Sequence, residues 1–380
     1  MIVFNEPLII GTEQENLNQV IRGGYFCGNG EFTKICETLL ANQFQAKKVL
    51  LTSSGSSALS IAAELLDIQP GDEIILPSFT HVGTASAFAL RKANLIWCEI
   101  KTLTRNLDEE ALESLITRKT KAVIAVNYAG MTDNIDKIKE ICTHHSLILI
   151  EDNASGIGAD YQNQPLGSFG DLAIISFHQT KNIHCGEGGA LIINTPKFLQ
   201  PAQKIRDRGT DRKDFNEGRI NTWTWHLNGS NYYLSEFQAA FLFAQIIKLG
   251  EVNFYRQSLL KGYLQNLKGI LPERSLPLID ENCYSNGHCF SILTESEQHR
   301  QYIIDKLHQK GIQSAFHYQP LHKAPYWQGL YKNLKLPATE KVAETILRLP
   351  MHHNLCLNDI NEICQALADA FTSGRNHECK

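Results

Sequence analysis

The sequence predicts an α/β fold in which a mostly parallel sheet is flanked by helices, with a smaller α/β domain at the C-terminus. Short runs rich in Ile, Leu and Val alternate with amphipathic stretches from about residue 48. This pattern is typical of parallel strands that are buried on both faces and joined by helices. The alternation gives way to long helical periodicity after about residue 230, and the 380 residues fit one large core plus a smaller one.

Each strand is predicted from an apolar run and each helix from an amphipathic periodicity. The expected strands are KVLLT (48–52), EIILP (73–77), NLIWCEI (94–100), AVIAVNY (122–128), LILIEDN (147–153), LAIISF (172–177) and GALIIN (189–194). The expected helices among them are SSALSIAAELL (56–66), a stretch near 82–91, LDEEALESLIT (107–117) and DNIDKIKEICTHH (133–145).

The last third of the chain is predicted to form the smaller domain. Residues 234–267 hold no proline and read as one or two helices that join a large domain, 1–250, to a small domain, 251–380. A strand at HCFSILT (288–294) and helices at EQHRQYIIDKLHQKG (297–311) and DINEICQALADAF (359–371) complete it.

Composition argues against several classes of protein. A net charge of −4 does not favour a broad basic surface for nucleic acid. The first residues lack a basic n-region with a long apolar segment, and no apolar run approaches the ~20 residues that span a bilayer, so we expect a cytoplasmic protein without membrane attachment. The ten cysteines are expected to be reduced thiols. Cys283, His288 and Cys289 lack a second ligand pair, so no metal is expected there.

Two ionisable residues in mid-chain carry the chemistry. Asp152 ends the run ILIED, and Lys181 lies between LAIISF and the glycine-rich GEGG. Ligands of parallel sheets bind at the carboxyl ends of strands, and pyridoxal 5′-phosphate needs a lysine for its aldehyde and an anion for its ring nitrogen. A surface lysine and a capping aspartate are the alternatives. Glu151 is a competing carboxylate, and since adjacent strand residues point to opposite faces, only one of the two can face the cofactor.

A third candidate is the junction TSSGSSAL (52–59), between an expected strand and helix. Small residues there leave backbone N–H groups open at a helix N-terminus, which suits a phosphate group. A plain helix cap by Ser56 or Ser57 explains the same residues.

These three pieces, in this order, resemble the DegT/DnrJ/EryC1/StrS sugar aminotransferases of fold type I. The resemblance extends from FNEPL near the start to PLHKAPYW and LRLPMHHNL in the last third, and its most specific part is SFHQTKN followed by GEGG. It implies that Lys181 holds the cofactor, that Asp152 pairs with the ring nitrogen, and that HYQPLH (317–322) lies near the substrate.

The resemblance also implies the phosphate contacts. Ser56 and Ser57 take the place of a Gly-Thr-Ala turn, and Ser176 takes the place of a phosphate-binding serine. Asn231, in GSNYYLSE, matches an asparagine that reaches the phosphate of a neighbouring subunit. A homodimer with shared active sites is therefore expected.

Three positions depart from the family pattern. Ser155 stands where Gln or His bonds the phenolic oxygen of the cofactor, and His81 stands where a larger aromatic ring stacks. Asn127 replaces a histidine in the strand before YAG. Both Ser155 and His81 remain in the expected cofactor site.

The expected reaction follows from the resemblance, which is strongest to members acting in enterobacterial common antigen and lipopolysaccharide synthesis. L-glutamate gives its amino group to the cofactor, which passes it to C4 of dTDP-4-dehydro-6-deoxy-D-glucose and yields dTDP-4-amino-4,6-dideoxy-D-galactose. A 3-keto sugar substrate and a non-catalytic regulator that binds the cofactor are the alternatives. The deoxysugar dehydratase branch carries a histidine at the lysine position, so Lys181 favours transamination.

Overall fold

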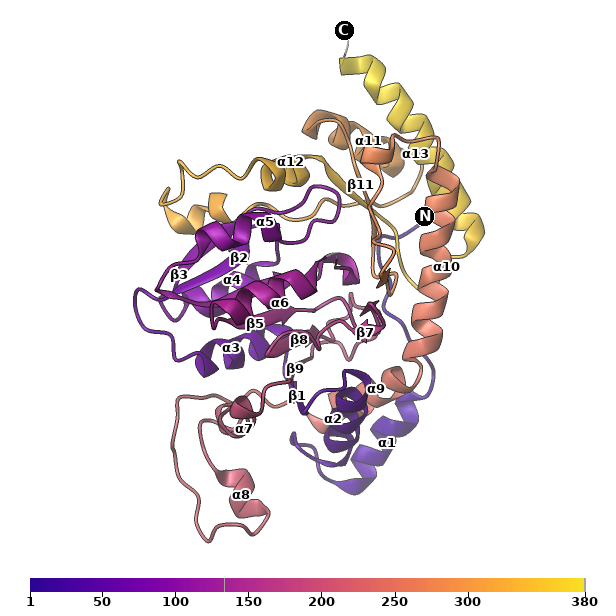
Figure 1. Cartoon of the computed structure of the whole chain (residues 1–380). Coiled ribbons are helices and arrows are strands. Elements are labelled where there is room, and N and C mark those ends of the chain that lie inside the picture. Colours follow the sequence, from indigo (N-terminus) through magenta and orange to yellow (C-terminus); the bar gives the residue numbers. More distant parts are fainter. Residues whose placement is uncertain (133, 379–380) are drawn as a thin grey trace.

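The computed structural model describes residues 1–132 and 134–378, with side chains described through residue 374. Its centre is a seven-stranded sheet in the order β1-β9-β8-β5-β4-β2-β3 (Figure 1). The strands are β1 (Lys48–Thr52), β2 (Glu73–Pro77), β3 (Asn94–Cys98), β4 (Thr120–Val126), β5 (Ile148–Asp152), β8 (Leu172–Ser176) and β9 (Gly189–Ile193). All seven strands expected from the sequence are present, and only β9 runs antiparallel to its neighbours.

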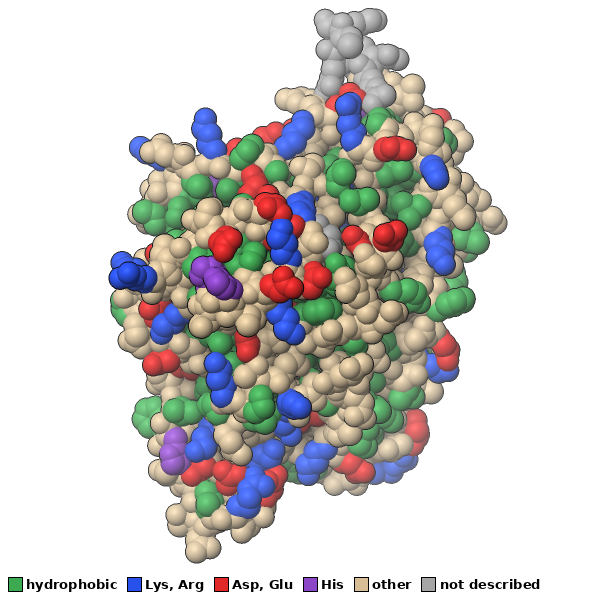
Figure 2. Space-filling model, viewed as in Figure 1, with side chains coloured by type: hydrophobic (Ala, Val, Ile, Leu, Met, Phe, Trp, Pro, Cys, Tyr) green, Lys and Arg blue, Asp and Glu red, His purple; other side chains and the backbone are tan. Residues whose placement is uncertain are grey.

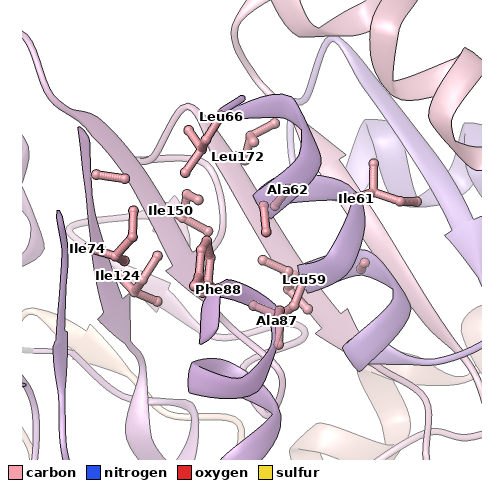
Figure 3. Close-up of a cluster of buried hydrophobic side chains, with 14 of the residues drawn as sticks. Leu59, Ile61, Ala62, Leu66, Ile74, Ala87, Phe88, Ile124, Ile150 and Leu172 are labelled. Carbon is pink, nitrogen blue, oxygen red and sulfur yellow. The ribbon is translucent and has the colours of Figure 1, made fainter. Parts of the chain in front are cut away.

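Helices cover both faces of this sheet, as alternation along the strands requires. One face packs against α3 (Gly55–Leu65), α4 (Val82–Ala89) and α7 (Leu199–Arg206). Figure 3 shows part of this layer, where Leu59 and Ala62 of α3 and Phe88 of α4 meet Ile124 and Ile150 of the sheet. The other face packs against α5 (Glu109–Leu112), α6 (Ile135–His144), α1 (Glu13–Gly23), α2 (Glu31–Gln43) and α9 (Glu236–Ile247).

The structure corrects the expected helix at 107–117. Leu107 bridges back to Ile100, and the Asp108 side chain accepts a hydrogen bond from Glu110 N–H at 3.1 Å, so the helix begins only at Glu109. It continues as a 3₁₀ turn, Glu113–Leu115, and Ile116 is already extended. The N-terminal helices α1 and α2 were not anticipated; both pack against α9.

The C-terminal part is built around a second, smaller sheet. The expected helical stretch 234–267 divides at Lys248 into α9 and α10 (Leu249–Leu267). Strand β11 (Phe290–Leu293) pairs antiparallel with β12 (Ile346–Leu349), and α11 (Glu297–Gln309), α12 (Pro337–Thr345) and α13 (Leu357–Glu378) complete the layer. The N-terminal residues join it through a bridge between Ile2 and Ile312. A division at residue 250, just inside α10, stays a prediction.

The remaining elements are short. A three-stranded sheet in the order β10-β6-β7 joins β6 (Asp160–Tyr161), β7 (Gln164–Pro165) and β10 (Cys283–Tyr284), and α8 (Arg212–Asn216) lies on a long segment that projects from the body (Figure 1). Among the described residues, no helix has the length and apolar character needed to cross a membrane. On the face shown in Figure 2, acidic and basic side chains are interspersed.

Candidate active site

A cavity of about 550 Å³ lies at the carboxyl ends of β2, β4, β5 and β8. Its far wall comes from the smaller domain, through His317, Tyr318 and Arg348. The volume is within the range of small-molecule sites, and its position at the strand ends is where open α/β sheets bind ligands. The expected site residues that line it are Asp152, Lys181, Ser56, His81, Ser155 and Ser176.

Asp152 and Glu151 point to opposite sides of β5, which decides between the two carboxylates. Asp152 lines the cavity, accepting hydrogen bonds from Thr84 Oγ1 at 2.6 Å and Ala154 N–H at 3.2 Å. Glu151 accepts bonds from three backbone N–H groups, of Gly167, Phe169 and Gly170, and from the Asn127 side chain, and is fully buried. Burial raises the pKa of Glu151. Its carboxyl group therefore organises the 167–170 turn, and Asp152 is the one that faces a ligand.

Lys181 lies in the loop between β8 and β9 and lines the cavity. Its amine donates a hydrogen bond to Ser155 Oγ at 2.8 Å. Burial lowers the pKa of Lys181 to about 8, against the opposing influence of the Asp152 carboxylate and with some help from the Arg348 cation. An amine with this pKa has a substantial unprotonated fraction at neutral pH, which is what attack on an aldehyde requires.

The N-terminus of α3 forms the end of the cavity suited to a phosphate. Ser54, not Ser56 or Ser57, is the N-cap, and its Oγ accepts a bond from Ser57 N–H at 3.0 Å. Ser56 lines the cavity with Gly55 and Ser176, while Ser57 lies behind and bonds Ser53 and Ser54 through its hydroxyl. A Cβ on Gly55 would come within 3.2 Å of Ser176 Cβ, so glycine keeps this end open.

Two of the departures from the family pattern have structural explanations. Asn127 donates to Glu151 at 3.0 Å and to Asn153 at 3.2 Å, so its side chain belongs to the buried network beneath the site. His81 caps α4 by accepting from Gly83 N–H at 3.0 Å, and its ring lies edge-on to Tyr318.

Asn231 lies outside the cavity. Its side chain is exposed, and its backbone bridges to Asp207 beside the projecting segment that carries α8. Within one chain the structure therefore does not bring Asn231 to the other expected site residues. Cys283 and Cys289 are both buried, and no group of three metal-ligating side chains is found among the described residues.

Several residues of the cavity were not anticipated individually. Tyr128 follows β4, His288 precedes β11, and Arg348 lies in β12. His317 and Tyr318, the start of HYQPLH, do reach the cavity, whereas His322 is buried against Ser78 and Glu340. No local pattern marks Arg348, because a small-domain strand meets the large domain only in the folded chain.

The cavity fits pyridoxal phosphate by the chemistry of its donors. It offers a part-buried amine with a lowered pKa at one position and a carboxylate that accepts a hydrogen bond from Thr84 Oγ1 at another. Open backbone N–H groups and hydroxyls at a helix N-terminus provide an anion site at its end. These are the three groups that the cofactor's aldehyde, ring nitrogen and phosphate require.

Known proteins share this architecture over the full chain. The model of the DegT/DnrJ/EryC1/StrS aminotransferase family matches residues 7–368. GDP-perosamine synthase of Vibrio cholerae is 28% identical over 379 residues, which is 98% of this chain and 99% of the relative. PseC of Helicobacter pylori, an aminotransferase involved in the biosynthesis of pseudoaminic acid, has a TM-score of 0.87 at 26% identity, covering 98% of this chain and 99% of its own.

Spr1654 of Streptococcus pneumoniae has the same fold in two cofactor forms. Its PLP form has a TM-score of 0.90 at 23% identity, covering 98% of this chain and 99% of its own, and its PMP form has a TM-score of 0.91 at 24% identity over 100% of both chains. A family match of this extent, over a cavity with this chemistry, leads to one conclusion: the chain belongs to the DegT/DnrJ/EryC1/StrS aminotransferase family and is a PLP-dependent sugar aminotransferase of fold type I.

Proposed function

We propose that this enzyme transfers the amino group of L-glutamate to C4 of a nucleotide-linked 4-keto-6-deoxy sugar, with dTDP-4-dehydro-6-deoxy-D-glucose as the substrate and dTDP-4-amino-4,6-dideoxy-D-galactose as the product. The observation that carries the catalytic part is the Lys181 amine, which has a pKa of about 8 and shares a cavity with the Asp152 carboxylate. The resemblance of the sequence to common antigen and lipopolysaccharide enzymes supports the sugar.

The site residues are assigned the following roles in this reaction. Bound pyridoxal phosphate supplies an electron sink that stabilises negative charge on the substrate carbon. Asp152, fixed by Thr84 Oγ1 at 2.6 Å, keeps the ring nitrogen protonated. Lys181 Nζ holds the cofactor and, once released from it, carries a proton to and from the reacting carbon. Its hydrogen bond to Ser155 Oγ at 2.8 Å positions the free amine between successive proton transfers.

The phosphate is assigned to the N-terminus of α3, with the hydroxyls of Ser56 and Ser176. Ser57 is assigned to the same turn, which it orders from behind the cavity by donating its N–H to Ser54 Oγ at 3.0 Å. His81 is assigned to the ring face, where its imidazole covers less area than a larger aromatic side chain. Asn231, which is exposed and bridges through its backbone to Asp207, completes the phosphate site of a partner subunit in a homodimer.

The relatives support the nucleotide less than any other part of this proposal. The Vibrio cholerae relative is named for a GDP-linked product, so a GDP-linked ketosugar is the second candidate. The test is to incubate the PLP-loaded enzyme with L-glutamate and a panel of dTDP- and GDP-linked 3-keto and 4-keto sugars, and to determine the position of the new amine by NMR. We expect amination at C4 of the dTDP sugar. A 3-amino product or exclusive use of GDP sugars would correct the substrate, and no amine product from any of them would favour the non-catalytic regulator.

A further inference from the structure

His288 is a buried imidazole in the wall of the cavity. It lies two residues before β11, and the residue is 9% exposed. Its Nδ1 forms a 3.0 Å hydrogen bond with Asn182 Oδ1, next to Lys181 in the chain, whereas Nε2 has no hydrogen-bond partner among the described residues. A buried polar side chain that is left without a partner in the wall of a ligand site points to a polar group of the ligand.

The neighbours of His288 decide which of its ring nitrogens carries the proton. Asn253 Nδ2 donates to the backbone carbonyl of Ile157 at 3.0 Å, so Asn253 Oδ1 is free to accept from Asn182 Nδ2 at 2.9 Å. Asn182 Nδ2 also donates to the backbone carbonyl of Asn286 at 2.9 Å, which leaves Asn182 Oδ1 to face His288 as an acceptor. Nδ1 therefore carries the proton, and in the neutral imidazole Nε2 is an acceptor.

The imidazole of His288 stays neutral in this position. Burial, reinforced by the cations of Lys181, Arg256 and Arg348, lowers the pKa of His288 well below its ordinary value. A neutral ring nitrogen with a lone pair gains nothing from a carboxylate, which also only accepts. The group that completes His288 is therefore a hydrogen-bond donor, and it lies on the side of the cavity that the Lys181 charge reaches.

The ligands of the proposed reaction differ in the donors that they bring to the cavity. The amine of L-glutamate is the group transferred, and its two carboxylates only accept. The ring nitrogen of the cofactor is assigned to Asp152. The ketosugar brings hydroxyl groups, and its C4 is bonded to C3, which carries a hydroxyl, and to C5, which carries the methyl group and the ring oxygen. The C3 hydroxyl is therefore the donor nearest the carbon that is aminated.

We propose that His288 Nε2 accepts a hydrogen bond from the C3 hydroxyl of the ketosugar, an inference that rests on the proposed function and deepens it. The contact turns C4 of the sugar toward Lys181 and selects sugars with a free hydroxyl next to the carbonyl carbon. Asn182 is a positioning residue, because it holds the imidazole in the tautomer that accepts. A sugar without this hydroxyl is rejected, since it would leave a buried acceptor unpaired.

The test is a cycle in which the acceptor and the hydroxyl are each removed. His288→Asn removes Nε2, while its amide N–H takes the place of the Nδ1 proton and can still donate to Asn182. dTDP-4-dehydro-3,6-dideoxy-D-glucose removes the hydroxyl, and kcat/KM of the pyridoxamine form is measured with each sugar. We expect wild type to prefer the 3-hydroxy sugar by about 10–100-fold. His288→Asn should lose about the same factor with the 3-hydroxy sugar and discriminate the two sugars by no more than ~3-fold.

Two controls separate recognition of the hydroxyl from packing. The corresponding 2-deoxy ketosugar should be affected equally in wild type and His288→Asn, because its missing hydroxyl lies elsewhere on the ring. His322→Asn is the matched variant, since His322 is buried, bonds Ser78 through Nδ1 at 2.8 Å and lies outside the cavity, and it should keep the wild-type preference. In His288→Asn the glutamate half-reaction and the affinity for PLP should both stay within ~3-fold of wild type.

A preference for the 3-hydroxy sugar that survives in His288→Asn would overturn the assignment. Equal losses in the two half-reactions would also overturn it, and a weakened affinity for PLP would place Nε2 at the cofactor instead. His288→Ala, which removes the same acceptor, enters the cycle if His288→Asn does not fold.

If wild type aminates no ketosugar, the proposed function fails, and binding measurements still decide the role of His288. The probes are the unreactive dTDP-6-deoxy-D-glucose and its 3,6-dideoxy counterpart, titrated into the holoenzyme in a calorimeter. Wild type should bind the 3-hydroxy sugar more tightly and His288→Asn should bind the two alike. Equal affinities of wild type for the two sugars would overturn the assignment.

Discussion

Asp152→Asn tests the division of labour between two adjacent carboxylates. Asparagine has nearly the same shape, and its Oδ1 can still accept from Thr84 Oγ1, which bonds Asp152 at 2.6 Å in the native protein. The amide cannot accept from Ala154 N–H with its nitrogen, so that weaker 3.2 Å contact is lost. The effect on the free energy of unfolding should therefore be only about 1 kcal/mol. The effect on the reaction barrier of losing the negative charge opposite the ring nitrogen should be far larger than this effect on stability.

That charge acts in a water-poor site, where removing one preorganised electrostatic partner raises the barrier by about 3–4 kcal/mol. We expect the glutamate half-reaction of Asp152→Asn to slow by about 10²–10³-fold, with kcat normalised to bound cofactor. Stopped-flow absorbance measures the rate, and thermal unfolding measures stability in the same sample.

Glu151→Gln is the matched control, since it makes the same chemical change one residue earlier on the opposite face of β5. Its amide would turn a donor toward backbone N–H groups that now point at a carboxylate, at 2.7–2.9 Å. We expect a loss of about 1–3 kcal/mol in stability and a nearly unchanged half-reaction per bound cofactor. The reasoning is refuted if Asp152→Asn reacts at a near-normal rate, or if the two variants lose rate equally.

Three more predictions concern the rest of the site. Because the Lys181 pKa is about 8, the rate at which apoprotein captures PLP should fall about tenfold per pH unit below pH 8. The stability of the apoprotein should rise between pH 8 and the usual lysine pKa, because in this range the unfolded chain binds a proton that the folded chain has lost. A capture rate that still rises steeply above about pH 9.5 would contradict this pKa. Ser176→Ala should weaken PLP binding by ~10–100-fold in equilibrium dialysis. The melting temperature of the apoprotein should change little, since the Ser176 hydroxyl accepts only a long 3.3 Å bond from His178 N–H, and an unchanged affinity would remove Ser176 from the phosphate site. Asn231→Ala should speed loss of PLP from the dimer while monomeric protein shows no such effect; equal retention by wild type and variant in dialysis would rule out the contact between subunits.

The sheet was predictable because its strands are nearly continuous apolar runs. Strand alternation predicted that only one of Asp152 and Glu151 faces a ligand, and the structure shows that it is Asp152. Lys181 was found from the motif around it. Local patterns mislead where a capping side chain sets the start of a helix. Asp108 caps a helix that begins at Glu109 and not at residue 107, and Ser54 is the N-cap for which Ser56 and Ser57 were the candidates.

Residues that the sequence left unassigned owe their place to contacts between distant segments. Arg348 lies on β12 and rests on Phe4, at the opposite end of the chain. Asn127 departs from the family pattern, but its bonds to Glu151 and Asn153 become visible only once β4 and β5 are paired. Long-range pairings of this kind are set by tertiary packing, which no local periodicity encodes.

The central claim is that one amine, Lys181 Nζ, holds the cofactor covalently. Borohydride reduction of the PLP-saturated protein, followed by peptide mass mapping, tests it directly. The claim predicts that the phosphopyridoxyl label is found on the peptide containing Lys181 and is absent from that position in Lys181→Ala. An unlabelled Lys181 in cofactor-saturated protein, or a label on another lysine, would contradict it.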